Sequence, residues 1–355
     1  MFLFLVPFVP FISVIITAHN RREFLLEAVN SALNQTLPKD EYEIIVVKNF
    51  EDERIDRFLE EHNVKNIVMK EEPLGAKIAR GVEESKGEVI SLLDDDDLWL
   101  PQKLEKVKQV FKDENVMYYH NNRYNFYGSL SIDSLIDNIK SNKDSGKLLK
   151  LTIRDMNKSL SPPGNNSSIT VRKKIFSKNA LDKIKNVYLA VDALLFYLAY
   201  CNNGYFVFDD QILTLRRVHT TNYSAARIID YESWLAYASN SIKKFKEDFM
   251  TFLDLFTHYD ECEIPNEYKK RLISHLEASY VRWVITYSRL PNTKNELTLR
   301  ALIKYFKYQL KYQRSLKPFL RGLYTFLPFA PKIIKDYATK RWHKDYLRTT
   351  GSNRQ

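Results

Sequence analysis

Between residues 11 and 119 the chain alternates short apolar stretches with helical patterns of about ten residues. The apolar stretches predict strands at Ile12–Thr17, Glu43–Val47, Val64–Met69, Val89–Leu93 and Val116–Tyr119. Such alternation is typical of a mostly parallel sheet with helices on both faces. Ligands of these sheets bind beyond the carboxyl ends of the strands. We therefore predict a Rossmann-like α/β domain with its ligand site at that edge.

Four consecutive aspartates, Asp94–Asp97, follow the apolar stretch Val89–Leu93 and precede Trp99 and Pro101. Adjacent carboxylates repel one another, which raises their pKa values unless a cation is near. A solvated acidic loop that only ends a strand is the simpler interpretation. The apolar strand before the run and the helix-starting proline after it favour a site for a nucleotide and a divalent cation. Mg²⁺ or Mn²⁺ suits such a site, because it binds carboxylate oxygens and keeps positions for phosphate oxygens.

Polar residues follow three of the expected strands. Thr17–Arg21 follows the first, Lys48–Asn49 the second and Asp94–Asp97 the fourth. Because the carboxyl ends of parallel strands meet at one edge, the three stretches are expected to converge on one crevice. Beyond the first strand, Asn20 with Glu23 three residues later predicts the N-terminus of a helix.

A single aspartate, Asp192, stands within the apolar helical pattern Val187–Tyr200. Burying a carboxylate there is costly unless it has a partner or a function. A helix cap or a paired core residue explains Asp192 as well as a catalytic role does. The residues alone leave both interpretations open.

Two cysteines, Cys201 and Cys262, stand far apart in the sequence. We therefore expect neither a disulfide framework nor a cysteine-rich zinc site. The cysteine content fits a protein of a reducing compartment. The apolar arm Met1–Pro10 is too short and proline-broken for a spanning helix, and it lacks a secretory signal. A cytoplasmic protein is expected, with peripheral attachment to the inner face of a membrane as an option.

Positive charge is concentrated at the C-terminus. The chain carries +10, but residues 297–355 hold 14 basic and 2 acidic residues, a net charge of +12 that leaves −2 elsewhere. Long amphipathic helices are expected at 231–258, 268–287 and 297–314. Aromatic and basic residues interleave after 316, which suits an anionic membrane surface. A helical bundle with a solvated basic face fits equally well, and no nucleic acid is expected.

Four segments, in this order, resemble the family 2 glycosyltransferases of the GT-A fold. They are residues 13–21, 75–99, the helix around Val191-Asp192, and the Arg-x-His segment 215–224. The resemblance covers about residues 11–225 and implies a GT-A domain at 1–230, whereas the pattern of charge and amphipathic helices predicts a basic helical region at 231–355. It also implies metal-dependent, inverting transfer of a sugar from a nucleoside diphosphate to an acceptor hydroxyl.

The resemblance assigns roles residue by residue. Asp192 would be the catalytic base, and Asp96 with His219 would bind the metal. The nucleotide-sugar site would comprise Thr17, Ala18, His19, Arg21, Asn49, Lys77, Arg80, Asp94 and Asp95. The family often has two aspartates where this chain has Lys48 and Asn49. The second of these aspartates helps to recognise the base, so the departure bears on which nucleotide is bound. A UDP-sugar is the first expectation, with a glycan, a lipid-linked molecule or a protein as acceptor.

Two other functional classes remain. A nucleotidyltransferase that makes nucleotide-sugars shares the crevice and the metal, but usually has a glycine-rich phosphate loop, which the stretch after Thr17 lacks. A catalytically silent protein of the same fold, acting through its basic tail, is the other. The sequence does not predict the sugar, the oligomeric state or the role of residues 128–160, which we interpret as a variable excursion or lid.

Overall fold

The computed structural model describes residues 9–128, 146–219, 230–294, 296–313 and 331–349, and the statements below concern these residues. The chain forms two compact units, each described by itself. Unit 1 comprises Met1–Val218 with Tyr259–Pro265, and unit 2 comprises His219–His258 with Asn266–Gln355. The expected domains 1–230 and 231–355 stay a prediction, and these units differ from them in assigning residues 259–265 to unit 1.

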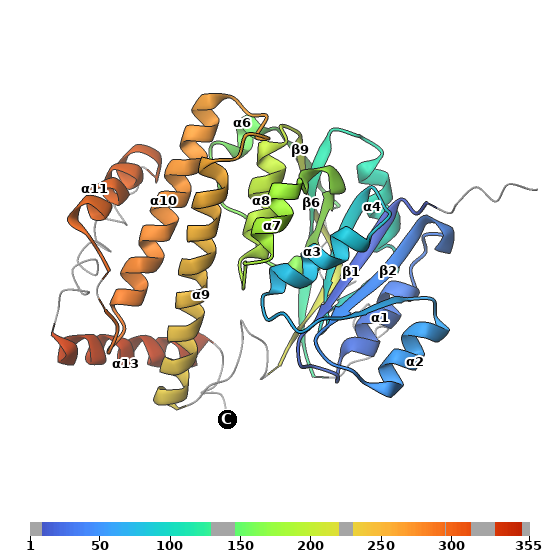
Figure 1. Ribbon diagram of the computed structural model, residues 1–355, viewed down its shortest axis with the longest axis horizontal. Coiled ribbons are helices and arrows are strands. Elements are labelled where there is room, and N and C mark those ends of the chain that lie inside the picture. The colour runs from blue at the N-terminus through green and yellow to red at the C-terminus, as the bar shows by residue number, and fades with distance from the viewer. Residues whose placement is uncertain (1–8, 129–145, 220–229, 295, 314–330, 350–355) are drawn as a thin grey trace, which may run out of the picture. The chain divides into compact units, whose positions relative to one another are not determined.

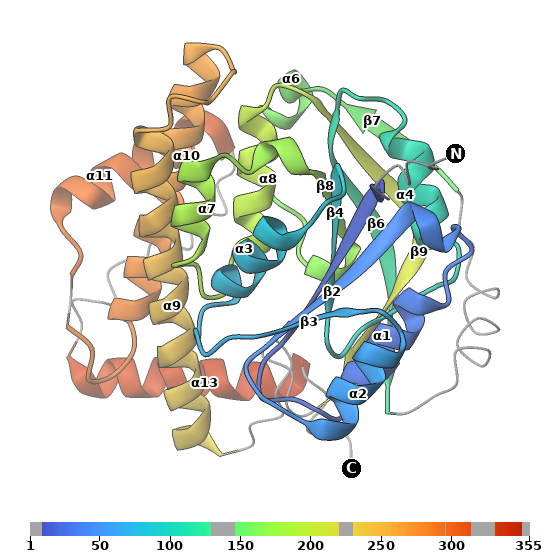
Figure 2. The same cartoon turned by 45° about the vertical axis from the view of Figure 1, so that its right-hand side comes forward.

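Unit 1 is built of strands and helices in alternation (Figures 1 and 2). Its strands are β1 Ile12–Ala18, β2 Tyr42–Lys48, β3 Lys65–Val68, β4 Val89–Asp94, β5 Leu98–Trp99, β6 Val116–Tyr127, β7 Leu148–Leu151, β8 Ile169–Arg172 and β9 Tyr205–Val218. Its α-helices are α1 Leu25–Leu33, α2 Glu53–Glu61, α3 Leu74–Glu84, α4 Lys103–Phe111, α6 Ile153–Met156, α7 Lys178–Ile184 and α8 Val191–Cys201. Short 3₁₀ turns lie at η1 Lys39–Glu41, η2 Asn166–Ser168 and η3 Lys173–Ile175.

The strands form one mixed sheet in the order β3-β2-β1-β4-β8-β6-β9-β5, with β7 on β9. Strands β3, β2, β1 and β4 are parallel, as the alternating pattern predicts. Strand β8 is antiparallel to both β4 and β6, while β6 and β9 are parallel. The predicted α/β class is confirmed, and parallel pairing is concentrated in the N-terminal half.

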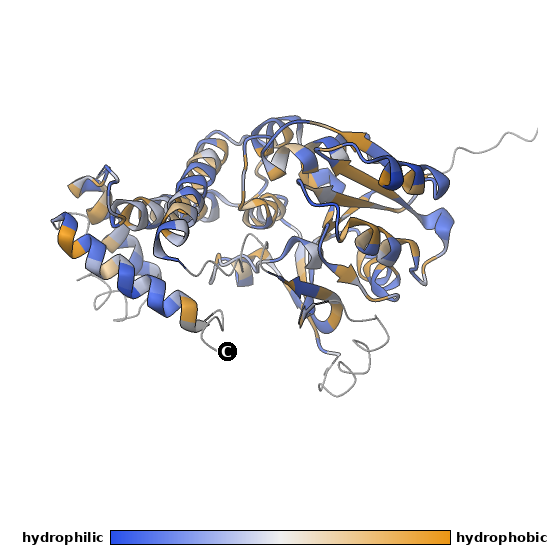
Figure 3. Ribbon diagram, turned by 90° about the horizontal axis from the view of Figure 1, so that it is seen from below, coloured by the Kyte–Doolittle hydropathy of each residue, from blue (hydrophilic) through white to orange (hydrophobic). Residues whose placement is uncertain are grey.

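Strand β1 lies in the middle of the sheet and is buried along its whole length. Alternate residues point to opposite faces. Ile12, Val14 and Ile16 belong to the core formed with α1, α2 and α4. On the opposite face, Ile15 contacts Gly81 of α3. Figure 3 shows the strands mostly in the orange of apolar residues, as expected for a sheet covered on both faces.

One local expectation is wrong. Helix α1 begins at Leu25 and has no side-chain cap, whereas Asn20 takes a left-handed conformation with φ 58°. Residues 205–218 form one long strand, β9, whose register against β6 shifts by two residues between Asp209 and Ile212. Within the expected 128–160 excursion, residues 129–145 lie outside the described residues, while β7 pairs with β9. The arm at residues 1–8 also lies outside them.

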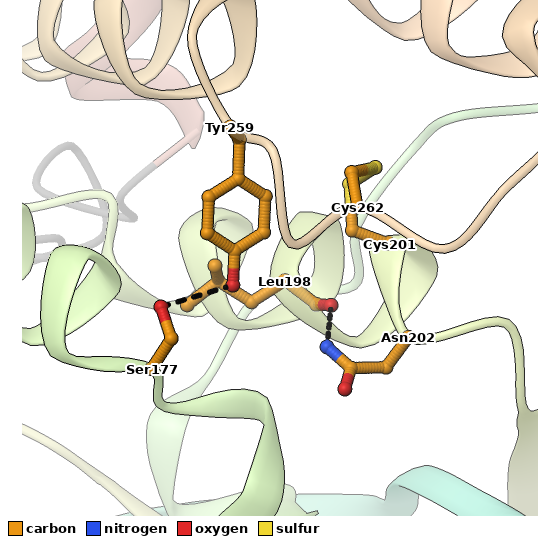
Figure 4. Close-up of a disulfide and its surroundings, with 6 residues drawn as sticks. All are labelled: Ser177, Leu198, Cys201, Asn202, Tyr259 and Cys262. Carbon is orange, nitrogen blue, oxygen red and sulfur yellow. Dashed lines mark hydrogen bonds between the residues drawn. A yellow bond between two sulfur atoms is a disulfide. The ribbon is translucent and has the colours of Figure 1, made fainter.

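The expectation that the cysteines stay unpaired is also wrong. Cys201 ends α8, and it forms a disulfide with Cys262, 61 residues later (Figure 4). Nearby, the Glu263 backbone N–H donates to the Cys201 carbonyl at 2.7 Å, and the Tyr259 hydroxyl lies 3.3 Å from Ser177 Oγ. Residues 259–265 are therefore fastened to unit 1 at several points.

Unit 2 is helical, as predicted. It comprises α9 Tyr231–Thr257, α10 Asn266–Ser288, α11 Leu299–Tyr308 with a π-helical turn Gln309–Gln313, and α13 Lys332–Thr349. Helices α9 and α10 lie side by side (Figures 1 and 2). Apolar residues of α10 and α11 form one core cluster, and α9 contributes Trp234 to a second. In the described part of the chain, no helix is both long and apolar enough to cross a membrane.

Candidate functional site

The ends of β2, β1 and β4 lie side by side at one edge of the sheet. Thr17 of β1 is in register with Val47 of β2 and with Asp94 of β4. Ala18 is level with Lys48. The three polar stretches expected to converge therefore do so.

Two adjacent residues at the end of β2, Lys48 and Asn49, have different partners. The Asn20 backbone N–H donates to Asn49 Oδ1 at 2.8 Å, and Asn49 Nδ2 donates to Asn20 Oδ1 at 3.0 Å. Lys48 instead turns inward and is fully buried. Its Nζ donates to the Phe50 carbonyl at 2.7 Å and lies 2.8 Å from Asp56 Oδ1. Of the two residues that depart from the family pattern, only Asn49 thus faces the loop after β1.

Arg21 pairs with two of the four aspartates. Its guanidinium donates to Asp96 Oδ2 at 2.6 Å and to both carboxylate oxygens of Asp95, from Nε at 3.4 Å and from Nη2. The His19 backbone N–H also donates to Asp95. The loop after β1 and the aspartate run after β4 are thus joined by charge-assisted hydrogen bonds.

Burial controls the charge of the aspartate run. Burial, together with the charges of Asp96 and Asp95, raises the pKa of Asp94 to about 7. Burial likewise raises the pKa of Asp95 to about 6, opposed by Arg21, and it raises the pKa of Asp97 well above its usual value. These carboxyl groups ionise more readily when a cation binds beside them.

Arg217 is a residue whose role the sequence analysis missed. Its buried guanidinium donates from Nε to the Asp96 carbonyl at 3.1 Å and from Nη2 to Glu27 of α1 at 2.6 Å. Its backbone N–H donates to Asp97 Oδ1 at 3.0 Å. Arg217 stands in the Arg-x-His segment that suggested the family, so a signal for it existed. It fixes the backbone of the aspartate run.

The turn η2 is a further support of the aspartate run that the sequence analysis did not identify. Ser167 Oγ accepts the Asp94 backbone N–H at 3.1 Å, and Asn166 Nδ2 lies 3.4 Å from Asp94 Oδ1. The Ser167 carbonyl accepts bonds from Trp99 Nε1 at 2.8 Å and from Lys103 Nζ at 3.1 Å. Ser167 therefore connects η2 to both ends of the aspartate run.

Asp192 is the second residue of α8 and is half-buried. A negative charge in the first turn of a helix is stabilised by the helix dipole. Asp192 Oδ1 accepts the Ala193 backbone N–H at 2.8 Å, and a Cβ added to Gly164 would lie 3.5 Å from Asp192 Oδ2. The loop that holds Asp94 at residues 166–167 thus passes Asp192 at residue 164.

Two side chains of β6 hold this loop from the other side. Arg123 Nη1 donates to the Gly164 carbonyl at 2.8 Å, and His120 Nε2 lies 3.2 Å from the same oxygen. Burial lowers the pKa of His120 to about 4, so the ring is neutral near pH 7 and its Nε2–H donates. Arg123 interacts electrostatically with Asp97 and with Asp192. Charge interactions therefore link the aspartate run to Asp192.

Three other predicted site residues lie in different settings. Lys77 is buried, and its Nζ donates to the Glu71 carbonyl at 2.7 Å, in the loop whose Glu72 lies 3.6 Å from His19 Nε2. Arg80 pairs with Glu84 of the same helix at 2.7 Å. His219 follows β9 directly and is half-buried. Their roles toward a ligand stay predictions.

The aspartate run suits a divalent cation that takes part of its coordination from a substrate. Among the described residues, no group of three or more His, Cys, Asp or Glu side chains is placed to hold a metal ion. Mg²⁺ is commonly held by one or two carboxylates together with substrate phosphates. The hard oxygens and raised pKa values of the run fit a cation bound in that way.

Residues 13–184 match the profile of Glycosyl transferase family 2. These residues are a family 2 glycosyltransferase domain. The predicted family and GT-A fold are thereby confirmed. The matched residues contain Arg21, the aspartate run and η2, whereas Asp192 and Arg217 lie beyond them.

Curated relatives of the glycosyltransferase domain match in part only. The glycosyltransferase AglE of Haloferax volcanii is 34% identical over 93 residues, which cover 24% of this chain and 31% of AglE. The putative teichuronic acid biosynthesis glycosyltransferase TuaG of Bacillus subtilis is 32% identical over 103 residues, which cover 27% of this chain and 40% of TuaG. The matches thus span less than half of these relatives.

A solved structure supports the same fold. The mannosyltransferase PcManGT from Pyrobaculum calidifontis, solved in complex with GDP-Man and Mn²⁺, superposes with a TM-score of 0.50 over 92% of this chain and 88% of its own. Its sequence is 11% identical, so the likeness concerns the fold alone. The GT-A assignment of the glycosyltransferase domain thus has sequence and structural support.

Proposed function

We propose that this protein transfers a sugar from a nucleoside diphosphate to an acceptor hydroxyl, with inversion at the anomeric carbon. The observation that carries the proposal is the loop at residues 161–168. It holds Asp94 through Asn166 and Ser167, and it passes beside Asp192 at Gly164. A donor at the aspartate run and an acceptor at Asp192 would therefore meet across one loop of a family 2 domain.

In the proposed step, Asp192 accepts the proton of the acceptor hydroxyl. The hydroxyl oxygen forms a bond to the anomeric carbon from the face opposite the leaving group, and the nucleoside diphosphate departs with the electrons of the broken bond. A positioned base contributes roughly 10²–10⁴ in rate. The half-buried position of Asp192 at the start of α8 suits a carboxylate that must stay ionised.

Asp96 would hold a divalent cation, Mn²⁺ or Mg²⁺, with His219 as a further predicted ligand. When bound, the cation neutralises charge that develops on the leaving diphosphate. The donor would then be surrounded by Asp94, Asp95, Arg21 and the stretch Thr17–His19. The Asn20–Asn49 pair at the neighbouring strand end would face the base.

The acceptor is proposed to lie at an anionic membrane surface. Residues 299–313 contain four basic and no acidic residue, and Leu299, Ile303 and Leu310 are 73%, 47% and 77% exposed. An amphipathic helix with this composition binds anionic lipid through charge and apolar insertion together. Attachment of this kind is consistent with a lipid-linked acceptor.

Release of nucleoside diphosphate from a panel of UDP-sugars and GDP-sugars with Mn²⁺ tests the proposed function. Sugar transfer to an alcohol acceptor, abolished by Asp192→Asn, would support it. Production of nucleotide-sugar from a sugar phosphate and a nucleoside triphosphate would instead indicate a nucleotidyltransferase. Donor binding without turnover for any acceptor would indicate a silent binding protein.

A further inference from the structure

Hydrogen bonds of Arg21 connect the loop after β1 to two buried carboxylates that follow β4. Asp95 and Asp96 are 1% and 6% exposed, and they lie after β4. Arg21 lies after β1, and its side chain is 28% exposed. Two adjacent buried carboxylates are strongly unfavourable without a partner, and Arg21 supplies one positive charge to both.

A divalent cation at this place needs the same oxygen lone pairs. Asp96 Oδ2 accepts from Arg21 at 2.6 Å, and both oxygens of Asp95 accept from the same guanidinium. A cation ligated by these carboxylates also repels the guanidinium. The metal and Arg21 are therefore competitors for Asp95 and Asp96.

The Arg21 side chain can rotate away from the two carboxylates. It stands between the end of β1 and the start of α1, next to Asn20 with its left-handed backbone. Its partly exposed side chain can turn without unfolding a helix or a strand. A guanidinium can bind phosphate oxygens in the same bidentate manner in which it binds a carboxylate. An incoming diphosphate therefore offers Arg21 an equivalent partner.

We propose that Arg21 is an internal counter-ion that makes metal binding depend on the nucleotide. It holds Asp95 and Asp96 until a divalent cation and a diphosphate arrive together, and it then moves from the carboxylates to the diphosphate. This inference rests on the proposed function, because it assumes that a nucleoside diphosphate binds at the aspartate run. Metal and nucleotide then strengthen each other's binding by the same factor.

Mn²⁺ binding to the full chain tests the proposal without any measurement of activity. Free Mn²⁺ is measured by electron paramagnetic resonance, with and without UDP or GDP, for the wild type, Arg21→Gln and Arg22→Gln. Glutamine keeps hydrogen-bonding groups but removes the charge. Arg22 is the matched control, because it is adjacent and pairs with Asp52 at 3.3 Å, away from the aspartate run.

Without nucleotide, Arg21→Gln is expected to bind Mn²⁺ at least about tenfold more tightly than the wild type. The strengthening of Mn²⁺ binding by nucleotide should shrink by a similar factor, while Arg22→Gln behaves as the wild type. Unchanged or weaker Mn²⁺ binding by folded Arg21→Gln overturns the proposal.

If Arg21→Gln fails to fold, Mn²⁺ binding by the wild type alone still tests the proposal. Equal Mn²⁺ affinity with and without nucleoside diphosphate overturns the counter-ion role, whereas at least about tenfold tighter binding with it supports the role. If neither UDP nor GDP binds in any condition, the proposed function fails. The comparison of Mn²⁺ affinities without nucleotide still decides whether Arg21 competes with the metal.

Discussion

Asn20 and Asn49 exchange two hydrogen bonds across the ends of β1 and β2, at 2.8 Å and 3.0 Å. The pair connects the loop that contains Arg21 to the end of β2. Lys48, the neighbour of Asn49, points the other way into a buried ion pair with Asp56. Two consecutive residues that depart together from the family pattern thus have separable tasks, and substitutions can separate them.

Asn49→Ala is expected to weaken nucleoside diphosphate binding by roughly three- to tenfold, the effect of one or two lost hydrogen bonds. Calorimetric titration with UDP and GDP measures this. Lys48→Met is the matched control: it should lower the free energy of unfolding in urea by about 1–2 kcal/mol, because half-buried Asp56 loses its partner, and leave nucleotide affinity unchanged. The reverse pattern would assign the base contact to Lys48.

Asp192→Asn is nearly isosteric and should leave donor binding intact. Turnover is expected to fall by at least about a hundredfold, because the amide cannot accept the acceptor proton. Steady-state transfer rates and calorimetric donor affinity measured on the same sample separate the two effects. Transfer at the wild-type rate would remove Asp192 from the mechanism.

Asp96→Ala is expected to abolish the Mn²⁺-dependent part of nucleoside diphosphate binding. The fold should survive, because Arg217 holds the Asp96 backbone carbonyl and not its side chain. Titrations with Mn²⁺ and with a chelator give the metal-dependent part directly. Equal affinity in both conditions for the wild type would contradict a metal at the aspartate run.

Gly75→Ala tests the packing of α3. A Cβ at Gly75 would overlap the carbonyl oxygen of Ile184 at the end of α7, so the substitution should lower the free energy of unfolding by at least about 2 kcal/mol. Gly164→Ala is the control, since its nearest contact would be an ordinary 3.5 Å to Asp192. Urea unfolding compares them, and equal stability of the two variants would show that α3 shifts at little cost.

Replacing Leu299 and Ile303 together by glutamine is expected to weaken binding to vesicles of anionic lipid by about tenfold or more, since apolar insertion is lost and the charge is kept. Met250→Gln on α9 is the control, because Met250 is 53% exposed and outside the basic stretch. Sedimentation with anionic and neutral vesicles at low and high salt provides the measurement. Equal sedimentation of both variants with the wild type would exclude α11 as the contact.

The sequence predicted those parts of the fold that depend on local pattern. Strands β1 and β4 and the long helix α9 follow from apolar periodicity, and convergence of the polar strand ends follows from parallel pairing. Asn20 was mispredicted as a helix cap because capping residues also suit left-handed turns. Its bond to Asn49, a long-range contact, decided between the two.

The supports of the candidate site were harder to predict, because each joins distant parts of the chain. Arg217 reaches Glu27 across 190 residues, and Ser167 reaches Asp94 across 73. Local spacing contains no information on such pairs, and only the resemblance to a family placed Asp192 with the aspartate run. The pairing of Cys201 with Cys262 was missed for the same reason, because the two residues are 61 positions apart.

The return of Tyr259–Pro265 to unit 1 means that this unit is not one continuous piece of chain. A protein shortened to residues 1–230 would lose Cys262 and Tyr259, and with them the partners of Cys201 and Ser177. Helix α9 is then an insertion, flanked on both sides by residues of unit 1. A single backbone cut anywhere between residues 202 and 261 would leave two fragments that separate on a denaturing gel only after reduction.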